Sequence, residues 1–211
     1  NQYFKTERYF PYICENKKGE SRQFCAEQLK IDSKQLAIPL QTHSNHIKYI
    51  DAPGEYADCD GLITSNPNVV LSLQTADCVP IFMVDKASGT RALIHAGWRG
   101  VVSNIVPNGL QLLQNSGIEV HGLNIFLGHS ICGNCYEVGD EVANEFSDSC
   151  KVQRDNGKWY VNLHGQIIEQ LASFNIQKSQ INTSTICTFE SSHCCSYRRD
   201  GEKAGRMFSF F

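Results

Sequence analysis

The sequence predicts a single α/β (α+β) domain with mixed β-sheets flanked by helices. Two patterns predict this class: short apolar runs bounded by Gly, Asn and Pro, which are typical of buried strands, and longer amphipathic segments that lie between them. The length of 211 residues fits one domain, since single cores usually hold roughly 100 to 200 residues. The sequence has no repeats, low-complexity tracts or polar linker, so we expect residues 1–211 to form one domain.

The predicted strands are short, apolar and bounded by turn residues. Residues 69–73, 81–84 and 91–95 are predicted to be buried strands, and residues 85–89 form the turn between the last two. Further strands are expected at residues 37–40, 123–127 and 181–187. The order of the strands in the sheets is not fixed by these patterns.

Three helices are predicted from apolar residues at helical spacing. The first is capped by Ser103, tolerates Pro107 near its first turn, runs to about Asn115 and is ended by Gly117. The second starts near Gly139, and the third spans residues 163–174. The expected inward residues are, in order, Ile105, Val106, Leu110 and Leu113; Val138, Val142 and Phe146; and Ile167, Ile168, Leu171 and Phe174.

Composition excludes several classes of protein. A net charge of −3 argues against a nucleic-acid-binding surface, which needs clustered Lys and Arg. No apolar run approaches the roughly 18 residues of a membrane helix, and residues 1–8 lack the features of a secretory signal. We therefore expect a cytoplasmic protein, in which the ten cysteines are reduced thiols or metal ligands rather than disulfides.

Three side chains at predicted strand ends could carry chemistry. His43 follows the run at residues 37–40, Cys78 lies between two apolar strands, and His95 ends the strand at residues 91–95. Two imidazoles and one thiolate suit zinc, and three protein ligands leave a fourth position for water, as in catalytic sites. Each residue alone also fits an ordinary structural role. The intervals of 35 and 17 residues are not those of a zinc finger, so spacing alone does not group them.

Several linked motifs resemble the YfiH family, whose members are also labelled polyphenol oxidase or laccase-domain proteins. The central signature and the upstream histidine motif lie at residues 60–64, 75–80, 95–100 and 41–43. Downstream matches follow in the family's order at residues 136–139, 187–188, 196–201 and 205–207. The resemblance covers roughly residues 35 to 207, and the family's opening segment is shortened or diverged in this sequence.

The resemblance implies a single mixed-sheet domain, a mononuclear metal bound by His43, Cys78 and His95, and catalysis by the same three residues. Family members are described as phosphorolysing adenosine, inosine and methylthioadenosine and as deaminating adenosine. We therefore expect a zinc enzyme, with copper as an alternative metal, that takes purine nucleosides and phosphate and is a monomer or homodimer. Metal-bound water with a pKa of about 7 suits deamination.

Phosphorolysis needs cations for phosphate, and four arginines are candidates: Arg99, Arg198, Arg199 and Arg206. Salt bridges to Asp77, Asp200 or Glu190 are the alternative role for each. His129 stands where the family commonly has Pro and is either a tolerated loop substitution or an extra base or ligand. Cys132 and Cys135 form a C-x-x-C without a matching second pair at zinc-ribbon spacing, although residues 193–195 are His-Cys-Cys.

Three rival functions use the same residues. In a metal-free thiol enzyme, Cys78 is the nucleophile and His43 or His95 the base. Copper-dependent phenol oxidation needs many paired histidines, and this sequence has seven without a His-x-His pair. A non-catalytic zinc domain would instead have a closed fourth ligand.

Overall fold

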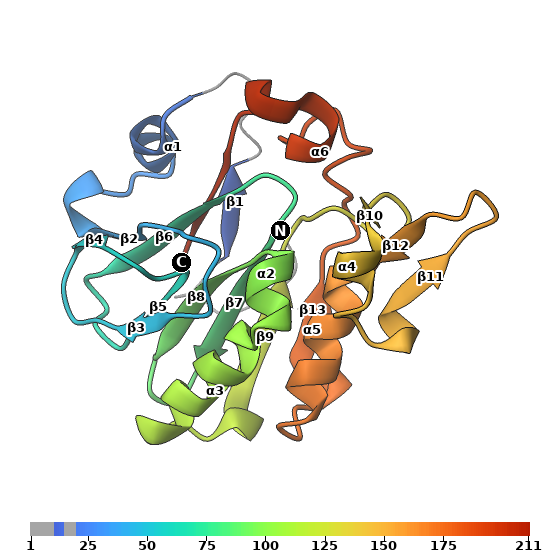
Figure 1. The fold of residues 1–211 in the computed structure, drawn as a ribbon. Helices are drawn as coiled ribbons and strands as arrows, with labels where there is room; N and C mark the ends of the chain where they lie inside the picture. The colour runs from blue at the N-terminus through green and yellow to red at the C-terminus, as the bar shows by residue number, and fades with distance from the viewer. Residues whose placement is uncertain (1–10, 15–19) are drawn as a thin grey trace.

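The computed structural model of the chain describes residues 11–14 and 20–211 (Figure 1). The prediction about residues 1–8 lies outside the described residues. None of the helices in the described segments is both long enough and apolar enough to span a bilayer.

A six-stranded mixed sheet forms the centre of the fold, in the order β13-β9-β7-β8-β5-β3. The inner strands pair antiparallel, whereas β3 with β5 and β13 with β9 are parallel. The mixed α/β class is therefore confirmed. The strands are β3 (Ile47–Tyr49), β5 (Gly61–Thr64), β7 (Val79–Asp85), β8 (Arg91–Ala96), β9 (Leu123–Leu127) and β13 (Ile181–Thr183).

The sequence of β7 explains why this sheet is covered on both faces. Ile81 and Met83 face one hydrophobic cluster, and the alternate residues Phe82 and Val84 face another. Asp85 then accepts hydrogen bonds from the amides of residues 87 and 88, which forms the predicted turn into β8.

Helices α2 (Trp98–Val102), α3 (Ile105–Asn115) and α5 (Leu163–Ala172) cover the first face (Figure 1). The predicted single cap at Ser103 is wrong, because the chain makes two helices here. Ser103 ends α2, and Asn104 takes a left-handed φ of 67° that turns the chain into α3. Gly117, with φ +82°, follows α3 as predicted. The third helix ends at Ala172 rather than at residue 174, because Asn175 adopts φ 61°.

A five-stranded sheet covers the second face, in the order β1-β14-β6-β2-β4. Leu71 and Leu73 of its strand β6 pack with Phe82 and Leu93. Helix α1 (Arg22–Gln28) contributes Cys25 and Ala26 to a smaller cluster with Phe208 and Phe210 of β14. The strands are β1 (Tyr12–Cys14), β2 (Leu36–Pro39), β4 (Gly54–Tyr56), β6 (Val70–Thr75) and β14 (Met207–Phe210).

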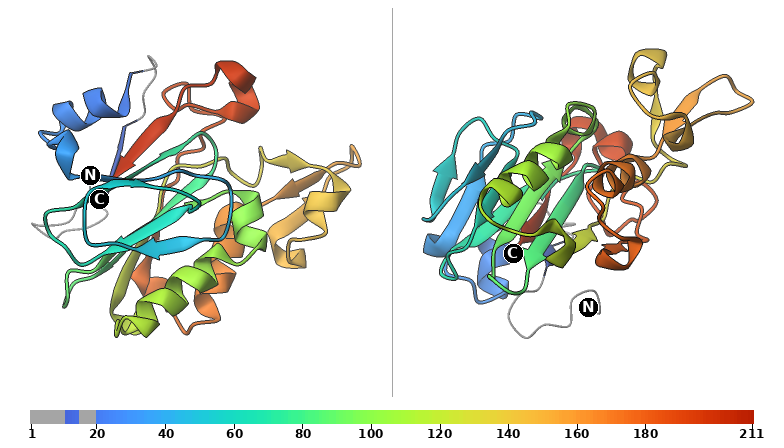
Figure 2. Two further views of the ribbon diagram at one scale, coloured as in Figure 1. Left: turned by 60° about the vertical axis from the view of Figure 1, so that its left-hand side comes forward. Right: turned by 90° about the horizontal axis from the view of Figure 1, so that it is seen from below.

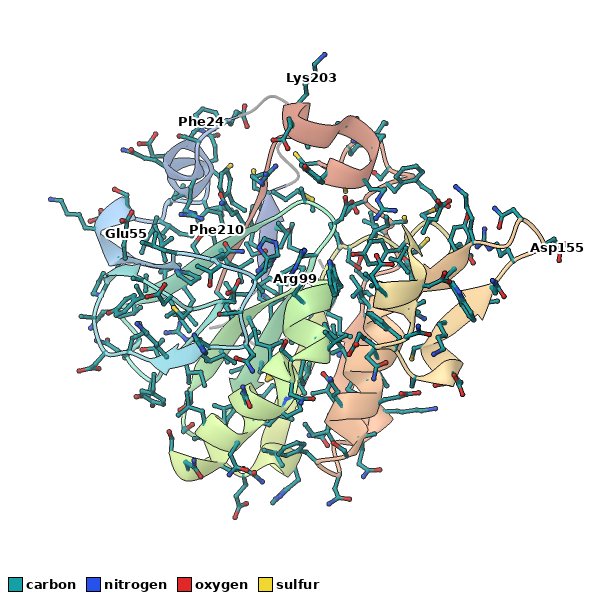
Figure 3. The ribbon with its side chains drawn as sticks, viewed as in Figure 1. Phe24, Glu55, Arg99, Asp155, Lys203 and Phe210 are labelled. Carbon is teal, nitrogen blue, oxygen red and sulfur yellow. The ribbon has the colours of Figure 1, made fainter. Side chains whose placement is uncertain are left out.

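A third, three-stranded sheet has the order β10-β12-β11, with β10 (Glu137–Val138), β11 (Lys151–Gln153) and β12 (Trp159–Val161). Its β11–β12 hairpin projects from the rest of the fold (Figure 2), and Asp155 marks the tip in Figure 3. Helix α6 (Tyr197–Asp200) lies just before the last strand. Short 3-10 turns occupy Ser33–Gln35, Val120–Gly122, Asp148–Cys150, Lys178–Gln180 and Gly201–Lys203.

Two further predictions need correction. The expected helix near Gly139 is only the four-residue α4 (Asp140–Ala143), and Val138, expected on its inner face, instead pairs with Trp159 in β10. The strand expected at residues 181–187 ends at Thr183, because the Ser184 hydroxyl accepts the amide of Ile186 and turns the chain away.

Candidate metal centre and cavity

His43, Cys78 and His95 converge from three separate segments of the chain. His43 follows β2, Cys78 lies in the turn between β6 and β7, and His95 lies at the end of β8. Their ligand atoms all lie within 4.8 Å of one another, and the two imidazole rings are 4.9 Å apart at an angle of 80°. The fold thus brings together three residues that sequence spacing did not group.

Asp60 orients His95, and the sequence analysis assigned it no role. The imidazole is buried, with 3% of its surface exposed, and its Nδ1 lies 2.8 Å from Asp60 Oδ1. A carboxylate that binds Nδ1–H leaves Nε2 as the nitrogen available to a metal, as in the carboxylate–histidine–zinc arrangement.

The same carboxylate fixes the loop that carries His43. Asp60 Oδ1 accepts the His43 amide at 3.0 Å, while Oδ2 accepts the Thr42 and Ser44 amides at 3.1 and 2.7 Å. The Ser44 hydroxyl donates to Oδ2 at 2.8 Å. These bonds hold His43 at φ 60°, an unusual conformation for a residue other than glycine. The sequence signal that could have identified Asp60 is its position beside Gly61, at the start of a buried strand.

Gly97 leaves space for Cys78 and His43 to approach each other closely. A Cβ atom at this position would lie 2.9 Å from Cys78 Sγ and 3.3 Å from His43 Cδ2. Its φ of −78° is ordinary, so the absence of a side chain, rather than backbone freedom, explains why glycine fits here.

Cys78 and His95 stabilise each other in their charged forms, thiolate and imidazolium. Burial by itself would raise the pKa of the Cys78 thiol, but the charge of His95 and hydrogen bonds from both imidazoles lower this pKa to about 6. Burial likewise opposes ionisation of His95, but the Cys78 thiolate and Asp60 raise its pKa to about 9. Hydrogen bonds from His95 and Ser44 outweigh burial and hold the pKa of Asp60 well below its usual range.

The cluster forms part of the wall of a cavity of about 430 Å³. Three of the four predicted arginines also line it, namely Arg99, Arg198 and Arg206. Arg99 lies in the first turn of α2 (Figure 3), with its guanidinium 4.4 Å from the Trp98 ring. Arg198 lies 5.0 Å from the Tyr136 ring and donates to the carbonyl of Glu137.

Arg199 does not line the cavity, contrary to the role considered for it. Its guanidinium pairs with Asp200 at 2.8 Å and donates to the carbonyls of Thr188, Phe189, Ser191 and Cys194. His129 is also directed elsewhere, since its Nδ1 lies 2.6 Å from the Ser184 hydroxyl. Asp77 accepts hydrogen bonds from the Arg198 amide at 2.7 Å and from the Thr188 hydroxyl at 2.6 Å.

Aromatic residues that the sequence analysis did not assign complete the cavity wall. They are Trp98, Tyr136 and Tyr197. Each of them belongs to a different family motif, at residues 95–100, 136–139 and 196–201, and the fold brings these three segments together. A larger hollow of about 610 Å³ beside α3 is lined mainly by amide and aliphatic side chains, and none of the described metal-ligand clusters lies in it.

The three residues fit a metal ion by their chemistry and by the carboxylate that binds His95. Imidazole and thiolate are zinc ligands, and neighbouring ligand atoms in tetrahedral sites lie about 3.3–3.8 Å apart, which small side-chain movements within a 4.8 Å cluster can reach. His95 already has its carboxylate partner. All three residues line the cavity, so a fourth ligand position would be open to water or substrate.

Fold and cluster together define a class: a mixed α/β protein with a candidate two-histidine, one-cysteine metal centre in the wall of a cavity. Within that class, the chain belongs to the family described as multi-copper polyphenol oxidoreductase laccase, which matches residues 15–211. Solved structures confirm the YfiH resemblance. YlmD of Geobacillus stearothermophilus has a TM-score of 0.84 at 28% identity, over 90% of this chain and 77% of that one. YfiH of Bacillus licheniformis has a TM-score of 0.82 at 27% identity, over 90% and 78%.

Two sequence relatives carry names of enzymes. A purine nucleoside phosphorylase of Clostridium acetobutylicum is 34% identical over 184 residues, which cover 84% of this chain and 76% of the relative. The adenosine deaminase RL5 of an unknown prokaryotic organism is 32% identical over 208 residues, which cover 90% and 79%.

Proposed function

We propose that the chain is a zinc-dependent purine nucleoside phosphorylase that also deaminates adenosine, with the metal held by His43, Cys78 and His95. The convergence of these three side chains in the wall of a cavity that also contains arginines and aromatic rings is the observation that carries the proposal. The names of the two relatives support the substrate class.

Zinc bound by the three ligands would supply a water of pKa about 7 for attack on the purine carbon that bears the amino group. Asp60 holds the proton on Nδ1 of His95 and thereby keeps Nε2 free for coordination. Gly97 leaves space for Cys78 and His43 to meet.

The remaining cavity residues suit the other parts of a nucleoside and a phosphate. A volume of about 430 Å³ lies within the usual range for small-molecule sites. The guanidinium groups of Arg99, Arg198 and Arg206 would bind phosphate, because their planar donors match its oxygens. The rings of Trp98 and Tyr136 line the same cavity and would contact the purine.

Tyr136 also offers a hydroxyl that stays protonated. Burial is the main reason why its pKa lies above the usual value, and the neighbouring Cys78 thiolate adds to the effect. The hydroxyl can therefore donate a hydrogen bond to a substrate atom at neutral pH.

The test is incubation of the purified protein with adenosine or inosine, with and without phosphate, followed by product analysis. Free base together with ribose phosphate, formed only when phosphate is present, would support phosphorolysis. Ammonia and inosine from adenosine would support deamination. Absence of any turnover in protein with a full complement of metal would contradict the proposal and favour a non-catalytic zinc domain.

One observation favours a second candidate, a metal-free thiol enzyme. Cys78 lies between two imidazoles, and its lowered pKa makes the thiolate available at neutral pH. Chelation separates the candidates: removal of metal would abolish turnover in the zinc enzyme and leave it intact in the thiol enzyme. Oxidation of a phenol only after copper loading would instead support the copper-dependent alternative.

A further inference from the structure

A second group of potential metal ligands lies outside the candidate site, on two loops that the fold brings together. Cys132 and Cys135 lie between β9 and β10, and Cys187 and Glu190 lie between β13 and α6. The four ligand atoms lie within 4.8 Å of one another. Ser130 and Cys187 form a parallel bridge, and the Thr188 amide donates to the Ser130 carbonyl at 3.0 Å, so backbone bonds hold the loops side by side.

Both loops have the same form, with two residues between the ligands. The first is Cys-Gly-Asn-Cys and the second is Cys-Thr-Phe-Glu. In the first, the Tyr136 amide donates to the Cys132 carbonyl at 3.0 Å, and in the second the Ser191 amide donates to the Cys187 carbonyl at 2.9 Å. The partner of the C-x-x-C motif is thus a C-x-x-E, which a search for a second cysteine pair misses.

A backbone amide points at the Cys187 sulfur. The Cys132 amide donates to Cys187 Sγ at 3.3 Å. A hydrogen-bond donor of this kind stabilises a thiolate more than a neutral thiol. The thiolate is the form of cysteine that binds metals, so this arrangement favours the ligating form of Cys187.

The distances suit a tetrahedral ion. Cys135 Sγ lies 3.3 Å from Glu190 Oε1. With zinc–sulfur bonds of about 2.3 Å and zinc–oxygen bonds of about 2.0–2.2 Å, neighbouring ligand atoms of a tetrahedral site are about 3.3–3.8 Å apart. Four protein ligands close the coordination sphere, which is typical of structural rather than catalytic zinc.

We propose that Cys132, Cys135, Cys187 and Glu190 form a second, structural zinc site. The ion joins segments 55 residues apart and anchors the loop at residues 187–191. Arg199 binds three carbonyls of this loop, at Thr188, Phe189 and Ser191, so the metal and the guanidinium hold the same segment. The loop leads into residues 197–198, which line the cavity, and the ion therefore supports one of its walls.

Metal analysis on a Cys78→Ala background separates this site from the candidate catalytic one. After purification in zinc-containing buffer and removal of loosely bound metal, we expect one zinc ion per chain in Cys78→Ala and none in Cys78→Ala/Cys187→Ser. Cys59→Ser on the same background is the control, because Cys59 is buried elsewhere and donates to the Tyr56 carbonyl, a bond that serine keeps. Equal zinc in the Cys187→Ser and Cys59→Ser proteins would overturn the proposal.

Cobalt provides a readout that does not depend on replacing a buried residue. Co²⁺ added to metal-free Cys78→Ala should give the strong thiolate-to-cobalt absorption of three sulfur ligands. Glu190 is exposed, so Glu190→Gln should fold normally, keep that absorption and bind Co²⁺ at least about tenfold more weakly. An unchanged Co²⁺ affinity, or a disulfide between these cysteines in freshly purified protein, would refute the site.

Discussion

Asp60→Asn tests whether one buried carboxylate organises the metal centre. The substitution keeps the size of the side chain but replaces one acceptor oxygen with an NH₂ donor. Oδ2 accepts four hydrogen bonds, from the amides and hydroxyls of Thr42 and Ser44, so the remaining amide oxygen should stay there. The NH₂ then replaces Oδ1, which faces the His43 amide and His95 Nδ1.

Two costs follow from that exchange. The part-buried hydrogen bond from the His43 amide loses its charged acceptor, which costs about 1.5–3 kcal/mol of unfolding free energy. His95 can accept from the new NH₂ only with its proton on Nε2, and that tautomer removes Nε2 as a ligand. Loss of a second-shell partner typically weakens metal binding about 10- to 100-fold, or about 1.4–2.7 kcal/mol.

Zinc affinity is measured by competition with a chromophoric chelator, and stability by urea unfolding of the metal-free protein. Asp58→Asn is the matched control, because it removes the same charge two residues away, at an exposed position with φ 49° that asparagine tolerates. If Asp60→Asn binds zinc and unfolds like Asp58→Asn, the reasoning about the carboxylate is wrong.

Three other predictions concern the same wall of the cavity. Gly97→Ala should weaken zinc binding and lower the free energy of unfolding by about 1–3 kcal/mol, because the added methyl group would lie 2.9 Å from Cys78 Sγ. Zinc affinity equal to that of the wild type would show that the cluster can expand and would contradict this prediction. In metal-free protein, labelling of Cys78 by iodoacetamide should rise with pH through about 6 and level off. Cys59 should stay unreactive in the same experiment, because it is buried and burial raises its pKa. Peptide mass spectrometry distinguishes the two cysteines, and a Cys78 midpoint near an ordinary thiol value would refute the proposed charge pairing. If the chain is a phosphorylase, Arg99→Gln should raise KM for phosphate about tenfold, because a charged hydrogen bond is lost. Arg154→Gln is the control and should leave KM unchanged, because Arg154 is stacked on Tyr160 outside the cavity. Equal effects of the two substitutions would exclude phosphate binding by Arg99.

Local patterns predicted much of the fold. The strands around residues 70–75, 79–85 and 91–96 and the core faces of α3 and α5 are visible in the sequence, because burial imposes a period of two or 3.6 on apolar residues. Errors occurred where long-range pairing competed with local propensity. Val138 joins a strand because Trp159 lies opposite it, and residues 184–187 leave their strand because of a bond within the loop.

The candidate site was likewise predicted only in part from the sequence. Residue type alone made His43, Cys78 and His95 plausible ligands, and the family motifs grouped them. The central role of Asp60, in contrast, depends on contacts between segments 16 or more residues apart. Arg199 is the opposite case, a residue that the sequence suggested for the site and the structure places elsewhere. Its guanidinium group suits phosphate, but in the fold it donates to loop carbonyls.

By itself, the sequence determined the α/β class, the buried strands and the chemistry that each side chain can offer, because these depend on residue type and on neighbours along the chain. Only the tertiary structure decided which arginines line the cavity, which carboxylate orients His95 and that a C-x-x-E loop faces the C-x-x-C loop. Hydrogen bonds and metal coordination act over a few ångströms, whatever the separation along the chain. Which residues pair therefore depends on where the strands end in three dimensions.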